Sequence, residues 1–341
     1  AVRVGFTPAP GYVLDGAAAT ISALASARTH GIGQKVDCSL LGGQIRLMGW
    51  TLTTAMWRNR NPVTGQARIT GTPERPGISA SFNDMDGKPM VFQLVGNIKW
   101  KAAIPGRGHS SPIVWGNRVF LTTAIEGAVI PGATAVKHVI NNQIVKFPDT
   151  VGAERSHALK LVSLDVETGK IVWERTVYEG RVYDDRQKTN SYASSTPATD
   201  GRYVYAYFGS EGLYCYDFEG NQVWKATLGG VAKMGYGEGT SPIIFENLVI
   251  LQVDTEMGDG SYIVAFDRTN GKQVWKTTRK NRSSWSTPVL VRGSKRVELI
   301  ASGAESVMSY DPATGKELWQ SEGLMSHAIP SPLVADDLVF V

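Results

Sequence analysis

The chain has 341 residues, of which 37 are Gly and 9 are Trp, while 42% are hydrophobic and 19% are charged. Globular proteins usually contain about a quarter of charged residues, so this composition indicates a turn-rich, aromatic-rich globular chain and excludes disordered, collagen-like and small disulfide-rich classes. The net charge of +4 does not indicate a nucleic-acid surface. Because the longest apolar stretch, residues 16–27, is too short to cross a bilayer and lacks the basic start of a signal peptide, we expect no membrane span.

Residues 1–96 show helical periodicity and no internal repeat. The spacing of Ile21, Leu24 and Ala25 places them on one face of a predicted helix. Glycines 31 and 33 end this helix. The expected elements are a helix over 15–29, a strand or extended segment over 35–41, a helix over 39–58, and a hairpin of residues 78–82 and 90–94 around Asp86-Gly87. The sequence therefore predicts an N-terminal α/β segment.

Part of this segment carries a family resemblance. Asp15-Gly16, the run from Gly31 to Leu41 and the Asp86-Gly87-Lys88-Pro89 turn resemble a piece of the class III CoA-transferases. The resemblance implies that Asp15 is an acyl carrier. The nucleotide-binding half of that family has no counterpart here, so no CoA pocket can be assembled, and an Asp at a helix start is ordinarily a cap. Acyl-CoA chemistry through Asp15 is therefore the third of our functional hypotheses.

From residue 97 onward, one pattern recurs four times: an Asp, a turn that contains Gly in each copy, and a Trp. The copies run over residues 163–173, 215–224, 265–275 and 309–319, with Trp-to-Trp steps of 51, 51 and 44 residues. The Asp predicts a tight turn because its carboxylate accepts hydrogen bonds from backbone N–H groups ahead of it, and Gly tolerates the positive φ that such turns require. The large Trp is expected to fill the gap between neighbouring sheets.

A second marker, Ser or Thr followed by Pro, precedes an apolar run in every unit. The prolines are Pro112, Pro197, Pro242, Pro288 and Pro332, and the last three steps are 45, 46 and 44 residues. Each unit is interpreted as four short strands: one after the Ser/Thr-Pro, a second such as 202–208, a third ending at the Asp and a fourth ending at the Trp. Four strands in about 45 residues are typical of a propeller blade.

These units resemble the repeats of the PQQ-like β-propeller family, which includes quinoprotein alcohol dehydrogenases and periplasmic outer-membrane assembly scaffolds. The predicted fold is mainly β, a β-propeller of four-stranded blades over residues 97–341, with four complete repeat units and a partial fifth after the N-terminal α/β segment. Quinoprotein dehydrogenases carry adjacent cysteines beside the quinone, whereas Cys38 and Cys215 are far apart. We therefore do not expect PQQ as a cofactor. The family is often periplasmic, but the sequence leaves the localisation open.

Members of this family usually close seven or eight blades, so four units and a partial fifth leave the ring incomplete. An incomplete ring leaves unpaired strand edges, which folded proteins seldom expose. Three hypotheses follow: the chain closes with fewer blades, pairs its edges in a homo-oligomer, or is a fused or truncated product.

In propellers, ligands collect at a central funnel lined by the loops between the Trp of one unit and the Ser/Thr-Pro of the next. A small molecule or a peptide is the partner expected there. The candidate ligand-binding residues are Arg107, Tyr183, Arg282 and Trp285, and the candidate catalytic residues are His109, His327 and Glu238. Either histidine could act as a general base near neutral pH, and the alternative is that both cap strands or face solvent.

Acidic pairs and clusters offer a second chemistry. Carboxylates are the ligands that Ca²⁺ prefers, and the candidate metal ligands are Asp184, Asp185, Asp254, Glu256 and Asp259. None of these stretches matches an EF-hand, and the alternative is an acidic, solvated turn. Residues 123–158 form a long insertion in the first unit, of the kind that often acts as a lid or a binding loop.

Two main functions remain open. The first is a binding scaffold that recognises a peptide or small molecule at the funnel without quinone redox chemistry. The alternative is a propeller hydrolase, such as a Ca²⁺-dependent lactonase or esterase, with funnel carboxylates on the metal and His109 or His327 as the base. The sequence contains no Gly-x-Ser-x-Gly, His-Glu-x-x-His or Walker motif.

Overall fold

The computed structural model describes residues 79–83, 89–93 and 100–341, apart from 141–142, 146, 257, 259, 294, 325–326 and 336–337. The chain divides into two compact units, Ala1–Ile98 and Lys99–Val341. In the first unit, β1 (Ser79–Asn83) and β2 (Pro89–Gln93) pair in antiparallel fashion, as the predicted hairpin requires. The predicted helices and Asp15 lie outside the described residues.

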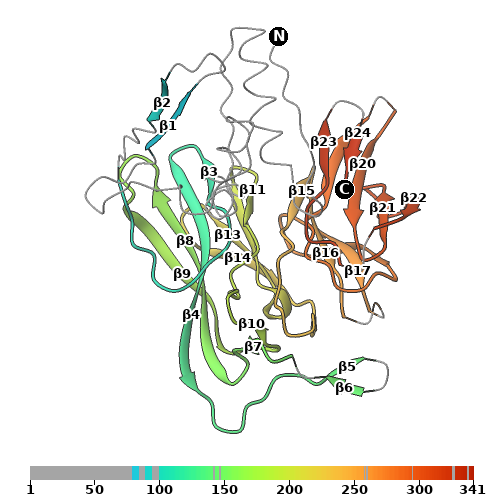
Figure 1. Ribbon diagram of the computed structural model, residues 1–341, viewed down its shortest axis with the longest axis horizontal. Coiled ribbons are helices and arrows are strands. Elements are labelled where there is room, and N and C mark those ends of the chain that lie inside the picture. The colour runs from blue at the N-terminus through green and yellow to red at the C-terminus, as the bar shows by residue number, and fades with distance from the viewer. Residues whose placement is uncertain are drawn as a thin grey trace. The chain divides into compact units, whose positions relative to one another are not determined.

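The second unit is built from four-stranded antiparallel sheets in which the strands follow chain order (Figure 1). We call these sheets blades 1 to 4. Blade 1 comprises β3 (Ile113–Trp115), β4 (Arg118–Val129), β8 (Arg155–Asp165) and β9 (Ile171–Arg181); blade 2 comprises β11 (Ala198–Thr199), β12 (Tyr203–Tyr207), β13 (Leu213–Asp217) and β14 (Gln222–Ala226). Blade 3 comprises β15 (Ile243–Phe245), β16 (Leu248–Val253), β17 (Tyr262–Asp267) and β18 (Gln273–Thr278); blade 4 comprises β19 (Val289–Arg292), β20 (Val297–Ser302), β21 (Ser306–Tyr310) and β22 (Glu317–Glu322).

A further hairpin of β23 (Leu333–Ala335) and β24 (Leu338–Phe340) follows blade 4. This is the partial fifth unit that the sequence predicts. The second unit is therefore mainly β, with blades in the order expected of a propeller. Within the described residues, no helix is long and apolar enough to cross a membrane.

The outermost strand of each blade differs from the prediction in one respect. It was expected to end at the Trp, but β9 continues from Trp173 to Arg181 and β14 continues from Trp224 to Ala226. The strands continue because residues beyond the Trp still pair with the third strand, as Ala226 does with Leu213. Each repeat Trp lies opposite a small residue, next to a register shift in the ladder; for Trp224 this residue is Cys215.

The repeat Trp connects neighbouring blades. The indole Nε1 of Trp224 in blade 2 donates a hydrogen bond of 2.9 Å to the carbonyl oxygen of Arg268, in the Asp turn of blade 3. Trp100, Trp173 and Trp275 make the equivalent bond to residues 166, 218 and 312. The glycine of the turn permits this contact: Gly271 has φ +72°, and a Cβ on it would lie 2.6 Å from a ring carbon of Trp224.

The Ser/Thr-Pro markers connect the innermost strands. The backbone N–H of Thr196 donates to the hydroxyl of Ser241 at 2.9 Å, and the N–H of Ser241 donates to the hydroxyl of Thr287 at 3.0 Å. The same bond joins Ser111 to Thr196 and Thr287 to Ser331, each at 3.0 Å. A hydroxyl at this position is thus a link to the preceding unit, which explains why the marker recurs once in every unit.

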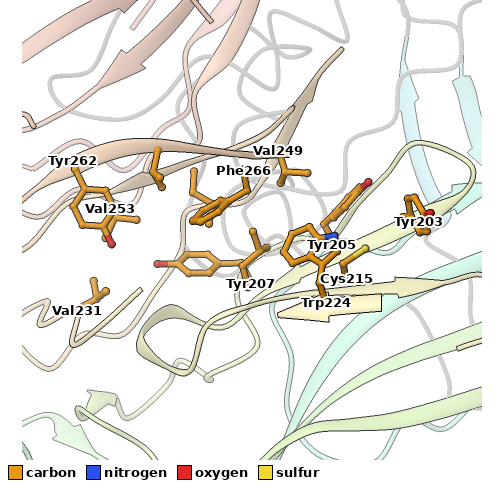
Figure 2. Packing of buried hydrophobic residues seen from close by; sticks show 13 residues of the cluster. Tyr203, Tyr205, Tyr207, Cys215, Trp224, Val231, Val249, Val253, Tyr262 and Phe266 are labelled. Carbon is orange, nitrogen blue, oxygen red and sulfur yellow. The ribbon is translucent and has the colours of Figure 1, made fainter. Parts of the chain in front are cut away.

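The core consists of apolar layers between successive blades. Figure 2 shows the layer between blades 2 and 3, where Tyr205 and Tyr207 of β12 lie against Val249 and Phe266 of blade 3. Trp173, Trp224 and Trp275 each belong to one of the three main layers and are buried. The predicted role of the repeat Trp as a filler between sheets is confirmed for these three, whereas Trp319 of blade 4 is 37% exposed and its indole donates a hydrogen bond to Glu298 of its own blade.

The insertion in blade 1 contains strands of its own. β4 and β8 extend into it as far as Val129 and Arg155, and between them lie the hairpin of β5 (His138–Ile140) and β6 (Gln143–Val145) and the short strand β7 (Thr150–Val151). β7 pairs with β10 (Arg186–Gln187), which lies in the loop between blades 1 and 2. In Figure 1 the hairpin extends away from blade 1, which is consistent with its contacts to later blades described below.

Candidate functional site

The loops that join the outermost strand of one blade to the innermost strand of the next contact one another in series. We call them the inter-blade loops. The side-chain amide of Asn190 donates to the carbonyl oxygen of Tyr236 at 3.0 Å, and the indole N–H of Trp285 donates to the carbonyl oxygen of Gly237 at 2.7 Å. The ring nitrogen of His327 lies 3.3 Å from the carbonyl oxygen of Ser283. Each loop therefore contacts the loop one blade further on.

Four aromatic side chains form a continuous row along these loops, and we call this row the aromatic arc. Phe147 of the insertion lies 5.2 Å from Tyr236 between ring centroids, Tyr236 lies 6.2 Å from Trp285, and Trp285 lies 5.9 Å from His327. The three neighbouring pairs are tilted or edge-to-face, the arrangements that aromatic quadrupoles favour. Phe147, Tyr236 and Trp285 are half-buried, and His327 is exposed.

A buried ion pair lies next to the centre of the aromatic arc. The ammonium of Lys233, a residue that is 1% exposed, lies 2.7 Å from Oε1 of Glu238 and 2.8 Å from the carbonyl oxygen of Ser284. The hydroxyl of Tyr207 donates to the other carboxylate oxygen of Glu238 at 3.0 Å. Because Ser284 immediately precedes Trp285, this ion pair fixes the loop that carries the central ring of the arc.

A second buried ion pair joins the insertion to two other parts of the second unit. Nδ1 of His138 lies 2.6 Å from Glu256 of blade 3, and Nε2 lies 3.2 Å from Asp184 in the loop between blades 1 and 2. Burial by itself would lower the pKa of His138, but hydrogen bonds and charge from Asp184 and Glu256 raise it to about 9. His138 is therefore a cation at neutral pH.

Asp254 takes part in a separate network between blades 3 and 4. Its Oδ1 lies 3.2 Å from Nε of Arg279, and its Oδ2 accepts hydrogen bonds from Ser284 at 2.6 Å and Gln252 at 2.8 Å. Burial raises the pKa of this carboxyl, and Arg279 and Ser284 oppose the increase. The network links the two blades beneath the inter-blade loop that carries Trp285.

A small polar cavity of about 30 Å³ lies beside the Lys233–Glu238 pair. Its lining residues include Asp184, Asp185, Glu211, Lys233 and Glu238. Burial raises the pKa of Glu211 to about 7, although the backbone N–H of Tyr183 opposes this shift. A volume of this size accommodates one or two water molecules and no organic ligand.

The structure places the predicted catalytic residues in different surroundings. His109 is exposed, and its Nδ1 lies 3.4 Å from the hydroxyl of Ser191 in the first inter-blade loop. Partial burial lowers its pKa, as do the positive charges of Arg107 and Arg186. His327 contacts a different loop and belongs to the aromatic arc. Glu238 is already bonded to Lys233 and Tyr207.

Of the predicted ligand-binding residues, Trp285 lies at the centre of the aromatic arc. Arg107 pairs through its backbone with Ala124 of β4, with an N···O distance of 2.8 Å, and its side chain is exposed. Tyr183 is 42% exposed, and its backbone N–H donates to Glu211 at 2.8 Å. Arg282 is exposed in the same loop as Trp285.

The predicted metal ligands do not converge. Asp184 and Glu256 share His138, Asp254 pairs with Arg279, and Asp185 accepts a hydrogen bond of 2.9 Å from the backbone of Ala153. Asp259 lies outside the described residues. Among the residues that the structure describes, no group of three His, Cys, Asp or Glu side chains is arranged to hold a metal ion. Because internal donors already occupy these carboxylates, the set does not fit Ca²⁺, which requires six to eight oxygen ligands.

Three members of the site are not among the residues predicted from the sequence. Phe147 and His138 lie in the insertion of blade 1, and Tyr236 lies in the second inter-blade loop. A signal for Tyr236 and Trp285 was available, because an aromatic residue follows the repeat Trp by 12 positions in blade 2 and by 10 in blade 3. No such signal exists for His138, whose partner Glu256 is 118 residues away.

The fold and the row of inter-blade loops define a β-propeller of four-stranded blades. Residues 54–243 and 259–341 match the family described as outer membrane protein assembly factor BamB, and the chain belongs to this PQQ-like repeat family. The match begins inside the segment that resembles class III CoA-transferases, and that resemblance gains no support from the comparisons.

Two curated relatives are similar to the chain. An outer membrane protein assembly factor BamB of Nitrosomonas eutropha is 25% identical over 185 residues, which cover 48% of this chain and 45% of that protein. A tetrathionate hydrolase of Acidithiobacillus ferrooxidans is 24% identical over 295 residues, which cover 78% of this chain and 54% of that protein. The chain thus spans about half the length of these relatives.

Two solved structures are also similar to the chain. BamB from Moraxella catarrhalis has a TM-score of 0.38 at 17% identity, over 75% of this chain and 76% of that chain. A europium-containing methanol dehydrogenase has a TM-score of 0.42 at 14% identity, over 63% of this chain and 42% of that chain.

Proposed function

We propose that this protein is a binding scaffold whose aromatic arc recognises an extended peptide segment of a partner protein, without quinone redox chemistry. The observation that carries the proposal is the row of Phe147, Tyr236, Trp285 and His327, which lie between 5.2 and 6.2 Å apart in successive contacts. Aromatic side chains on rigid loops provide large contact areas at low entropic cost, and Tyr and Trp dominate the binding energy of many interfaces.

The ionisable groups beneath the arc support a binding role over a catalytic one. Lys233, Glu238 and His138 are buried and bonded to one another or to neighbouring carboxylates. Such pairs hold loops in place and are not available to transfer protons to a ligand. A hydrolase with Ca²⁺ on the funnel carboxylates is less well supported, because internal donors already occupy those oxygens. The name of the matched family, an outer membrane protein assembly factor, also points to protein partners.

Selection of a phage-displayed library of random 12-residue peptides on the full chain tests the proposal. We expect selected peptides to bind the wild-type protein and to lose at least tenfold in affinity with Trp285→Ala, because a Trp near the centre of an interface is a typical binding hot spot, worth about 2 kcal/mol or more. Trp115→Ala is the matched control, since Trp115 is 50% exposed in blade 1 and does not belong to the arc. Equal affinity for the Trp285→Ala variant would contradict the proposal.

A further inference from the structure

The insertion of blade 1 runs across the inter-blade loops as a strap, which we define as residues 130–154 apart from 141–142 and 146. Its two ends are joined where it leaves blade 1, because the N–H of Ile130 donates to the carbonyl oxygen of Glu154 at 2.8 Å. The returning half is attached to the first inter-blade loop: the N–H of Lys188 donates to the carbonyl oxygen of Asp149 at 2.8 Å. The outgoing half is bonded to the end of β9, because the guanidinium of Arg181 donates to the carbonyl oxygen of Thr134, and its hairpin has a further attachment.

That attachment is His138. The residue is 5% exposed, and its two ring nitrogens contact Glu256 and Asp184. Two other residues of the hairpin bury little apolar surface, since Val139 is 40% exposed and Ile144 is 68% exposed. Among the described residues of the hairpin, His138 therefore provides the main buried contact with blade 3.

The strap also covers one end of the aromatic arc. Phe147, which follows β6, packs against Tyr236 at a centroid distance of 5.2 Å and against His138 at 6.0 Å. Displacement of His138 would therefore remove the ring that packs on one side of Phe147, whose backbone stays bonded to Thr150, and would let Phe147 uncover the ring of Tyr236. Tyr236 is the first residue of the arc that lies outside the strap.

We propose that residues 130–154 form a latched strap over the aromatic arc, that His138 is the latch, and that its release uncovers Tyr236. The release itself requires no ligand. Only its consequence for binding rests on the proposed function.

Charged groups from two loops, and a backbone N–H group from a third, surround the latch. Asp184 and Asp185 come from the first inter-blade loop, Glu256 comes from the loop of blade 3, and the backbone N–H of Lys233 bonds Asp184 at 3.3 Å from the second inter-blade loop. The carboxylates outnumber the cation, so the site favours protonated His138. The latch is therefore closed at neutral pH, and it weakens as the pH rises from 6.5 to about 9, where the imidazole loses its proton.

Hydrogen exchange measured by mass spectrometry on the full chain tests the latch. We expect His138→Ala to increase exchange at least tenfold in residues 131–139 and 147–153 and to leave β12, β16 and β17 unchanged. His138→Gln, which keeps a hydrogen-bonding side chain without the charge, should give a smaller increase. Lys188→Ala is the matched control, because it removes an exposed ion pair between the first inter-blade loop and Asp149 of the strap and leaves the latch intact.

Unchanged exchange in the strap, or an equal increase in the blade strands, would overturn the latch. Chemical nitration of Tyr236 is a second measurement, and the extent of nitration should increase in His138→Ala. If nitration stays constant while exchange in the strap increases, the proposal that release uncovers Tyr236 is overturned. Failure of the proposed function is a different outcome. It would be shown by peptides that are selected on the wild-type protein and bind outside the arc, whether or not the strap opens.

Discussion

The ammonium of Lys233 lies 2.7 Å from a carboxylate oxygen of Glu238, and both side chains are almost removed from solvent. Removing one partner of a buried ion pair leaves the other charge without compensation, which typically costs about 3 to 5 kcal/mol. We expect Lys233→Met to lower the free energy of unfolding by about 3 kcal/mol, because Tyr207 and two backbone N–H groups still bond Glu238. Urea denaturation followed by circular dichroism measures this change.

The double variant Lys233→Met/Glu238→Gln should be more stable than Lys233→Met alone, since the unpaired charge is gone. Lys280→Met, at an exposed position, is the control and should change the free energy of unfolding by no more than about 0.5 kcal/mol. Equal losses in Lys233→Met and Lys280→Met would show that the ion pair does not stabilise the loops.

Substitutions at Trp224 distinguish the contribution of the hydrogen bond between blades from the contribution of the packing between them. Trp224→Phe keeps a ring in the core and loses the bond of 2.9 Å to Arg268, so we expect a loss of about 1 kcal/mol. Trp224→Ala also opens a cavity and should cost about 3 to 5 kcal/mol. Trp319→Ala, whose ring is 37% exposed, is the comparison and should cost clearly less. Thermal unfolding of the three variants provides the ranking, and a ranking with Trp319→Ala first would contradict this account of the core.

Gly271, the turn glycine that packs against the ring of Trp224, is expected to tolerate no side chain. A Cβ at Gly271 would lie 2.6 Å from the indole and would also adopt φ +72°, whereas Gly229, at φ +79°, has no atom within 4 Å of such a Cβ. Gly229→Ala should therefore show only backbone strain of about 1 kcal/mol, and Gly271→Ala should lose clearly more stability by urea denaturation. Equal losses would mean that the blades move apart freely at this turn.

The buried His138 predicts a pH dependence of stability. Its pKa is raised from 6.5 to about 9 in the folded protein, so the folded state binds the proton more tightly than the unfolded state. The stabilisation is therefore complete below pH 6.5, decreases between pH 6.5 and 9, and disappears above that range. The difference in unfolding free energy between wild type and His138→Gln should be up to about 3 kcal/mol at pH 6 and small at pH 10. A difference independent of pH would show that His138 is not charged in the fold.

The blade repeat was predictable from the sequence because its contacts are local. The Asp and Gly of each turn lie within five residues of one another, and their hydrogen bonds close that turn, as Asp267 does with Thr269 and Asn270. The Ser/Thr-Pro markers also predicted where each blade begins. Their role as links between blades was not predictable, because Thr196 and Ser241 are 45 residues apart.

The candidate site was predictable only in part. Trp285 was selected because loops between blades are exposed positions on a rigid scaffold, and the structure places it in the aromatic arc. The carboxylates suggested a metal site because sequence cannot show which cations already neutralise them. Arg279 neutralises Asp254 from the inter-blade loop that follows β18, and His138 neutralises Glu256 from an insertion 118 residues earlier.

Photo-crosslinking tests the central claim most directly. A selected peptide that carries a benzophenone group is irradiated with the full chain, and the crosslinked residues are identified by mass spectrometry. The account predicts crosslinks to segments that contain Tyr236, Trp285 and His327, and their loss in Trp285→Ala. Crosslinks confined to the outermost strands β9, β14 and β18 would contradict it.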